Sequence, residues 1–195
     1  MRTDGTNRVG VVAAVATTIA CAMALTVHTA DAVATGVFRA SLNAAGGDPN
    51  GASGFNTVAV SGTGRYIVFA SDATNLVASD TNGQSDVFVR DTQSNTTERV
   101  SVASNGSQSN GPSVVFSPSA ISDDGRYVVY LSKATDLAPN DSNADATNAG
   151  GVDAFLRDRL NGTTTLIARR SDGSTFDSSV NPVISADGST VALSV

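Results

Sequence analysis

The chain has little of the chemistry that most enzymes use. It contains one cysteine, one histidine and two methionines among 195 residues, and no tryptophan. The cysteine and the histidine are Cys21 and His28, so the sequence from residue 33 onward has neither a thiol nor an imidazole. Disulfides, a Ser-His-Asp or Cys-His nucleophile and the commonest zinc ligands are therefore excluded there. This scarcity predicts a protein that is not an enzyme.

Positive charge is also scarce. Lysine and arginine number 12 against 18 aspartates and glutamates, the formal net charge is −6, and Lys133 is the sole lysine. The arginines are spread along the chain, so the sequence has no basic stripe that could follow a phosphate backbone. We expect no nucleic-acid partner.

A basic and then apolar segment opens the sequence. Arg2 and Arg8 precede a 19-residue run from Val9 to Val27, which is mostly apolar, and the small residues of Ala30-Asp31-Ala32 follow it. This order predicts a signal peptide over residues 1–32 and a secreted or periplasmic bacterial protein that does not contact the membrane after cleavage. An uncleaved membrane anchor is the alternative, because the run approaches spanning length.

The rest of the sequence repeats itself about every sixty residues. The stretch from Ser61 to Phe69 returns from Ser122 to Tyr130 and, more loosely, from Ser185 to Leu193. A period of this size is typical of arrays in which each unit buries its apolar faces against its neighbours.

Each unit predicts four short strands rich in β-branched and aromatic residues, separated by Gly, Asn, Asp and Ser. The expected strands are residues 65–69, 86–91, 97–102 and 114–121 in the first unit and 126–130, 153–158, 163–168 and 183–184 in the second. Because helical periodicity is absent, we predict an all-β fold, a partial β-propeller of four-stranded antiparallel blades. A β-sandwich is the alternative, but it does not explain the repeat.

The phase of the repeat predicts about two complete blades with fragments at both ends. We expect an outer strand and linker of an incomplete first blade, repeat 1, repeat 2 and the start of a truncated repeat 3, over residues 33–60, 61–121, 122–184 and 185–195. Propellers close with four to eight blades. The remaining blades are therefore expected from a longer parent chain or, alternatively, from a homo-oligomer. The blade faces around Val191 and Leu193 are expected to be bare on one side.

Several motifs resemble the TolB-like, WD-like β-propeller repeat. They are Ser122–Val128, Ala73–Leu76, Asp80–Gly83 and Asp86–Asp91. The resemblance covers essentially residues 36–195 and implies a binding platform in exported bacterial proteins. Gly62-Thr63 and Ser189-Thr190 depart from the pattern.

Two loops place oxygen-bearing side chains on alternate residues, the spacing with which a curling loop surrounds Ca²⁺. The candidate calcium ligands are Asp80, Asn82 and Asp86 in the first repeat and Asp141, Asn143 and Asp145 in the second. The alternative is that these side chains form solvated Asx turns without metal. No other cofactor is expected.

The remaining charged motifs favour structural roles. Asp123 and Asp124 could supply the acid and base of a glycosidase, but their place before Gly125 is typical of turn formers. The pairs Arg90-Asp91 and Arg157-Asp158 recur at one strand end, which indicates repeated ion pairs between strands or blades.

We therefore predict an exported, non-catalytic β-propeller segment that serves as a scaffold for binding a protein or a glycan. The alternatives are a carboxylate-dependent hydrolase of polysaccharides and a calcium-stiffened structural spacer.

Overall fold

The computed structural model describes residues 39–139, 141, 151–167 and 181–194. These residues form ten β-strands and no helix, so they include no helix that could span a membrane. The predicted signal peptide, residues 1–32, lies outside the described residues.

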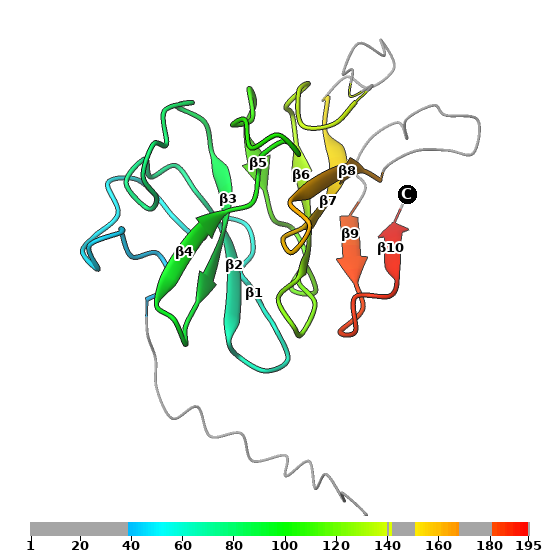
Figure 1. Cartoon of the computed structure of the whole chain (residues 1–195), viewed down its shortest axis with the longest axis horizontal. Coiled ribbons are helices and arrows are strands. Elements are labelled where there is room, and N and C mark those ends of the chain that lie inside the picture. The colour runs from blue at the N-terminus through cyan, green and yellow to red at the C-terminus, as the bar shows by residue number, and fades with distance from the viewer. Residues whose placement is uncertain (1–38, 140, 142–150, 168–180, 195) are drawn as a thin grey trace, which may run out of the picture. The chain divides into compact units, whose positions relative to one another are not determined.

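The strands form two four-stranded antiparallel sheets and one two-stranded sheet, which follow one another along the chain (Figure 1). The first sheet contains β1 (Ala59–Val60), β2 (Tyr66–Ser71), β3 (Asp86–Asp91) and β4 (Thr96–Arg99). The second contains β5 (Ser113–Val114), β6 (Tyr127–Ser132), β7 (Asp153–Asp158) and β8 (Thr163–Leu166). The third contains β9 (Asn181–Ile184) and β10 (Val191–Ser194). The predicted all-β fold with repeated four-stranded antiparallel sheets is confirmed.

The repeat in the sequence is reproduced in the register of the strands. Tyr66 pairs with Asp91 across β2 and β3, and Tyr127 pairs with Asp158 across β6 and β7. The turn before β2 and β6 is also the same, because Gly64 and its equivalents have φ near +73° and the serine hydroxyl three residues earlier accepts a hydrogen bond from the strand's first N–H. Glycine adopts this φ without the steric cost that other residues meet.

The segment predicted as one strand over 114–121 is divided in two. Residues 113–114 pair with β6, and Ile121 forms a separate bridge to Val128 of the same strand. Pro118 lies between them, where it cannot donate to a ladder, and Ser119 donates its N–H to the Ser117 hydroxyl instead. The segment therefore begins the second sheet and does not complete the first.

The residues before β1 keep the phase of the repeat. The Asn50 side chain donates to the Thr74 hydroxyl at 2.8 Å, and the equivalent Asn110 donates to Thr135 at 2.8 Å. The linker ahead of the first sheet is thus attached to its loop in the same way as the linker ahead of the second.

Apolar side chains join each sheet to the next. We call the side of a sheet that points toward the following sheet its forward face, and the opposite side its rear face. The forward face of the first sheet and the rear face of the second share one core cluster. Its members include Ala59, Val68, Val87 and Val89 from the first sheet and Ile121, Val128, Tyr130 and Phe155 from the second. All eight are buried. Because burying a Val or Phe side chain stabilises by about 1.5–3 kcal/mol, this contact is the main attraction between the sheets.

Polar and aromatic contacts set the register of neighbouring sheets. The Gly62 N–H donates to the Asp123 carboxylate at 2.6 Å, from one turn to the next. The Tyr66 ring lies against Gly125, so closely that an added Cβ would meet the ring at 2.4 Å. Tyr127 covers Gly188 of the third sheet in the same manner. Each tyrosine thus reaches over the glycine of the following turn.

We predict that Gly125→Ala destabilises the protein much more than Gly64→Ala. Both glycines have φ near +73°, so alanine costs about 1–2 kcal/mol of backbone strain at either position. Only at Gly125 would the methyl group meet the Tyr66 ring, which adds about 1–3 kcal/mol of overpacking, whereas Gly64 faces open space. Urea denaturation of both variants checks this, and equal losses would contradict the contact between sheets.

Candidate functional site

The first predicted calcium loop gathers its side chains around an arginine. Arg99, at the end of β4, places Nη1 2.8 Å from Asp80 Oδ1 and 3.2 Å from Asp86 Oδ2. Side chains of all three residues are almost fully buried. The guanidinium therefore supplies the positive charge that the two carboxylates require.

Other polar side chains of the protein complete this cluster, although the buried Nε of Arg99 has no hydrogen-bond partner among the described residues. Asn82 donates its side-chain amide to Asp86 Oδ2 at 2.9 Å, so it presents nitrogen rather than oxygen to the carboxylate. The Ser101 hydroxyl donates to Asp86 Oδ1 at 2.5 Å, and Gln108 Oε1 accepts from Arg99 at 3.0 Å. Burial raises the pKa of Asp80 above its ordinary value, and the Arg99 charge offsets only part of this rise. A calcium ion at Asp80 and Asp86 would compete with the Arg99 guanidinium for both carboxylates.

The second predicted loop differs at one decisive position. In the first sheet Arg99 pairs with Phe88, and at the equivalent position of the second sheet Leu166 of β8 pairs with Phe155. The second sheet therefore has leucine where the first has arginine. Asp141 is buried, and Asn143 and Asp145 lie outside the described residues. Among the residues that are described, no group of three or more His, Cys, Asp or Glu could hold a metal ion. Calcium binding stays a prediction.

Asp123 and Asp124 have separate structural partners. Asp124 accepts hydrogen bonds from the Ser122 hydroxyl at 2.6 Å and the Arg126 N–H at 3.0 Å, and these lower its pKa. It is a turn former, as the sequence indicates. Asp123 instead accepts from Gly62 of the preceding turn. A Cβ at position 62 would lie 2.6 Å from this carboxylate, which explains why the first repeat has glycine there.

Ion pairs recur in both sheets, but their arginines are Arg65 and Arg126, each directly before a strand. The predicted Arg90 and Arg157 instead donate hydrogen bonds to Thr97 and Thr164. Arg126 forms a two-point contact with Asp158 at 3.0 and 2.7 Å, and Arg65 forms the same contact with Asp91. The Arg126 hydrogen bonds, with the N–H groups of Asn161 and Leu160, lower the pKa of Asp158 to about 2. The equivalent pairing holds the pKa of Asp91 well below its usual range.

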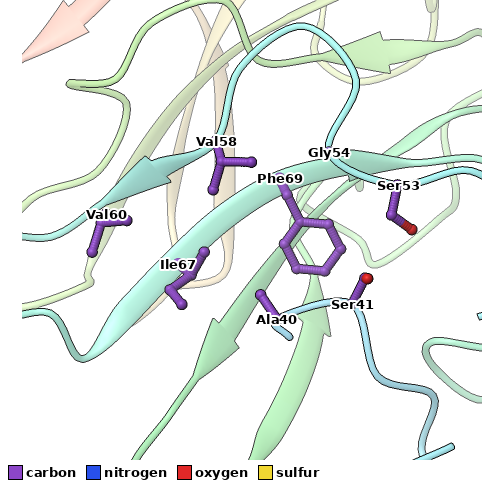
Figure 2. A pocket seen from close by; sticks show the side chains of 8 residues that line it. All are labelled: Ala40, Ser41, Ser53, Gly54, Val58, Val60, Ile67 and Phe69. Atoms are coloured by element: carbon purple, nitrogen blue, oxygen red, sulfur yellow. The ribbon is translucent and has the colours of Figure 1, made fainter. Parts of the chain in front are cut away.

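A groove of about 410 Å³ lies on the rear face of the first sheet. Figure 2 shows the side chains that line it, which are Ala40, Ser41, Ser53, Gly54, Val58, Val60, Ile67 and Phe69. Val58 and Val60 are 44% and 51% exposed. By the repeat, Val60, Ile67 and Phe69 are equivalent to Ile121, Val128 and Tyr130, which the first sheet covers. Ile67 and Phe69 are buried beside Ala40, so the described residues leave this face open mainly around Val58 and Val60.

Among the described residues, the third sheet is bare on one side, as predicted, but Val191 and Leu193 are not the residues that are exposed. Val191 and Leu193 are partly buried and pack on the clusters of the second sheet. The exposed side carries Val183, at 37%, and Ala192. Side chains alternate along a strand, so the neighbours of Val191 and Leu193 point forward while these two point rearward.

No family model matches this chain, and no curated protein matches it. Among solved structures it is similar to TolB from Acinetobacter baumannii, with 18% sequence identity, a TM-score of 0.38 and coverage of 74% of this chain. The chain spans about a quarter of the length of that protein, 26%.

We predict that Arg99→Leu lowers the free energy of unfolding by about 3–5 kcal/mol, because it leaves two buried carboxylates without their counter-charge. Arg39→Leu is the matched control. Its ion pair with Asp48 is largely exposed, so its loss should cost less than about 1 kcal/mol. Urea denaturation measures both, and similar small losses would show that the Arg99 cluster contributes little.

The same variant tests calcium in the first loop. Removing the guanidinium frees Asp80 and Asp86, so calcium should raise the melting temperature of Arg99→Leu more than that of the wild type. No effect of millimolar calcium on the variant would end the calcium prediction for this loop.

The ion pair of Asp158 predicts a loss of stability in acid. A carboxylate whose pKa falls on folding stabilises the protein fully above its unfolded pKa, near 3.8, and this contribution disappears as the pH falls through about 2. Asp158→Asn should cost about 1–2 kcal/mol at neutral pH. Denaturation measured from pH 7 to pH 2 should show the two proteins converging, and a constant difference would contradict the ion pair as its cause.

Proposed function

We propose that this chain is an exported, non-catalytic β-propeller segment that binds a protein through the groove of the first sheet. One observation carries the proposal. The rear face of the first sheet has the apolar character of an interface between sheets, yet Val58 and Val60 remain about half exposed. Exposed apolar surface gathered in a groove is characteristic of a protein-interaction site.

The lining of the groove favours a protein over a glycan. Its side walls are aliphatic and aromatic, and only Ser41 and Ser53 contribute side-chain hydroxyls. The Ser53 hydroxyl already exchanges a hydrogen bond with Ser71 at 2.7 Å. A sugar needs several polar groups that converge on its hydroxyls, whereas an apolar strand of a protein needs mainly surface to bury. A glycan is the alternative partner.

The absence of catalysis rests on the chemistry of the chain. The sequence beyond residue 33 has no histidine or cysteine, and Asp123 and Asp124 are both engaged in turns and contacts between sheets. A polysaccharide hydrolase would need two carboxylates that face one substrate. The alternative of a calcium-stiffened spacer depends on the two calcium loops. Export rests on the predicted signal peptide at residues 1–32.

The binding role is tested with Val60→Asp, which places a charge in the groove at an exposed position. Peptides selected from a random displayed library on the wild type should bind at least about tenfold more weakly to this variant, because the charge must be desolvated on binding. Leu160→Asp is the matched control, since Leu160 is 75% exposed and does not line the groove. Calorimetry measures the affinities.

Equal affinity for Val60→Asp and the wild type would show that the groove is not the binding site. If the library yields no binder while a glycan panel yields one that Val60→Asp abolishes, the partner is a glycan.

A further inference from the structure

We propose that the groove of the first sheet takes the third sheet of a second copy of this chain, so that copies associate head to tail. The forward face of β9 and β10 in one copy would lie on the rear face of β1 and β2 in the next. This inference rests on the proposed function of the groove and names its partner.

The first step is the equivalence of the rear faces. Ile121 and Val128 of the second sheet are buried under the first sheet, and the equivalent Ile184 and Val191 of the third sheet pack in the same core cluster. In the first sheet Val60, the equivalent of Ile121 and Ile184, is 51% exposed, whereas Ile67, the equivalent of Val128 and Val191, is buried. The same surface thus occurs three times, and in the first sheet it is only partly covered.

The second step is what covers it. On the forward face of the first sheet, β1 and β2 carry the paired residues Ala59 and Val68. Their equivalents in the second sheet are Ala120 and Val129. All four are at most 1% exposed. Small and β-branched side chains on two paired strands are therefore the surface that fits this rear face.

The third step is that the third sheet carries the same surface and that the described residues leave it partly exposed. Val183 and Ala192 occupy the positions of Ala120 and Val129, and they pair with each other across β9 and β10. Val183 is 37% exposed and Ala192 is also exposed. Within one copy this surface cannot reach the groove, because the third sheet packs on β6 and the second sheet separates it from the first.

The fourth step is the shape of the space that remains. Ala40 packs on the cluster of Ile67 and Phe69, and by the repeat it takes the position that Val100 has beside the second sheet. The segment before β1 therefore already fills the place of the outer part of a preceding sheet. The groove beside it lies where the first two strands of a preceding sheet would lie. In the third sheet these two strands are β9 and β10.

The contact between copies should be weaker than the contact between sheets of one copy. In the third sheet Thr190 replaces the tyrosine that, as Tyr66 or Tyr127, covers the glycine of the following turn. The space around Gly64, the glycine that the next copy would present, therefore stays open. Association should therefore depend on concentration. Because the two faces differ, the contact is heterologous and adds further copies until a ring closes.

Sedimentation velocity of the wild type over a range of concentrations tests this. We expect the mean mass to rise with concentration, and we expect both Val60→Asp and Val183→Asp to remain monomeric. A 1:1 mixture of these two variants should form a heterodimer and nothing larger, because the intact groove of one meets the intact third sheet of the other. Leu160→Asp is the control and should associate as the wild type does.

Three results would overturn the proposal. They are a wild type that stays monomeric at every concentration, a mixture of the two variants that stays monomeric, and a Val183→Asp variant that associates normally, which would indicate grooves pairing with each other or another surface. Val58→Asp replaces Val60→Asp if the latter unfolds at lower urea concentration than the wild type. A monomeric wild type that still binds selected peptides in the groove overturns only this inference and leaves the proposed function standing.

Discussion

The structure depends on the burial of one sheet's face against the next. The inner strands carry apolar residues on both sides, as in β2, where Val68 packs forward and Ile67 and Phe69 point rearward. A single sheet of this composition would leave both faces in water, so it cannot be stable alone. Each sheet is stable because its neighbours cover it, and the order of the sheets along the chain makes those neighbours available.

The contacts at the turns fix how neighbouring sheets are aligned. Apolar faces alone would tolerate sliding, whereas the hydrogen bond from Gly62 to Asp123 and the Tyr66 ring over Gly125 each fit one register. The departures from the repeat follow the same logic. Glycine at position 62 makes room for the Asp123 carboxylate, and Thr190 removes the tyrosine from the third sheet.

The repeat made the sheets predictable, because strands such as β3, Asp86–Asp91, recur with their flanking turns and have the same bounds in the structure. The cluster around Arg99 was not predictable, because the spacing of Asp80 and Asp86 in the sequence does not show that an arginine from β4 lies between them. The alternation of side chains along β10 indicates two faces, but the sequence does not show which face packs on the second sheet. In the structure it is the face of Val191 and Leu193. The groove was predictable from the repeat, because Val60 is an apolar residue equivalent to Ile121 and Ile184 but lies in the first sheet, which no other described sheet precedes.

Arg99 gives the first loop a permanent counter-ion. A loop that recruits calcium depends on the free ion around it and loosens when the ion is withdrawn. Here the positive charge is part of the polypeptide, bound to both Asp80 and Asp86, and cannot diffuse away. The order of this loop should therefore depend less on the salts around the protein than the order of a loop that is held by a free ion.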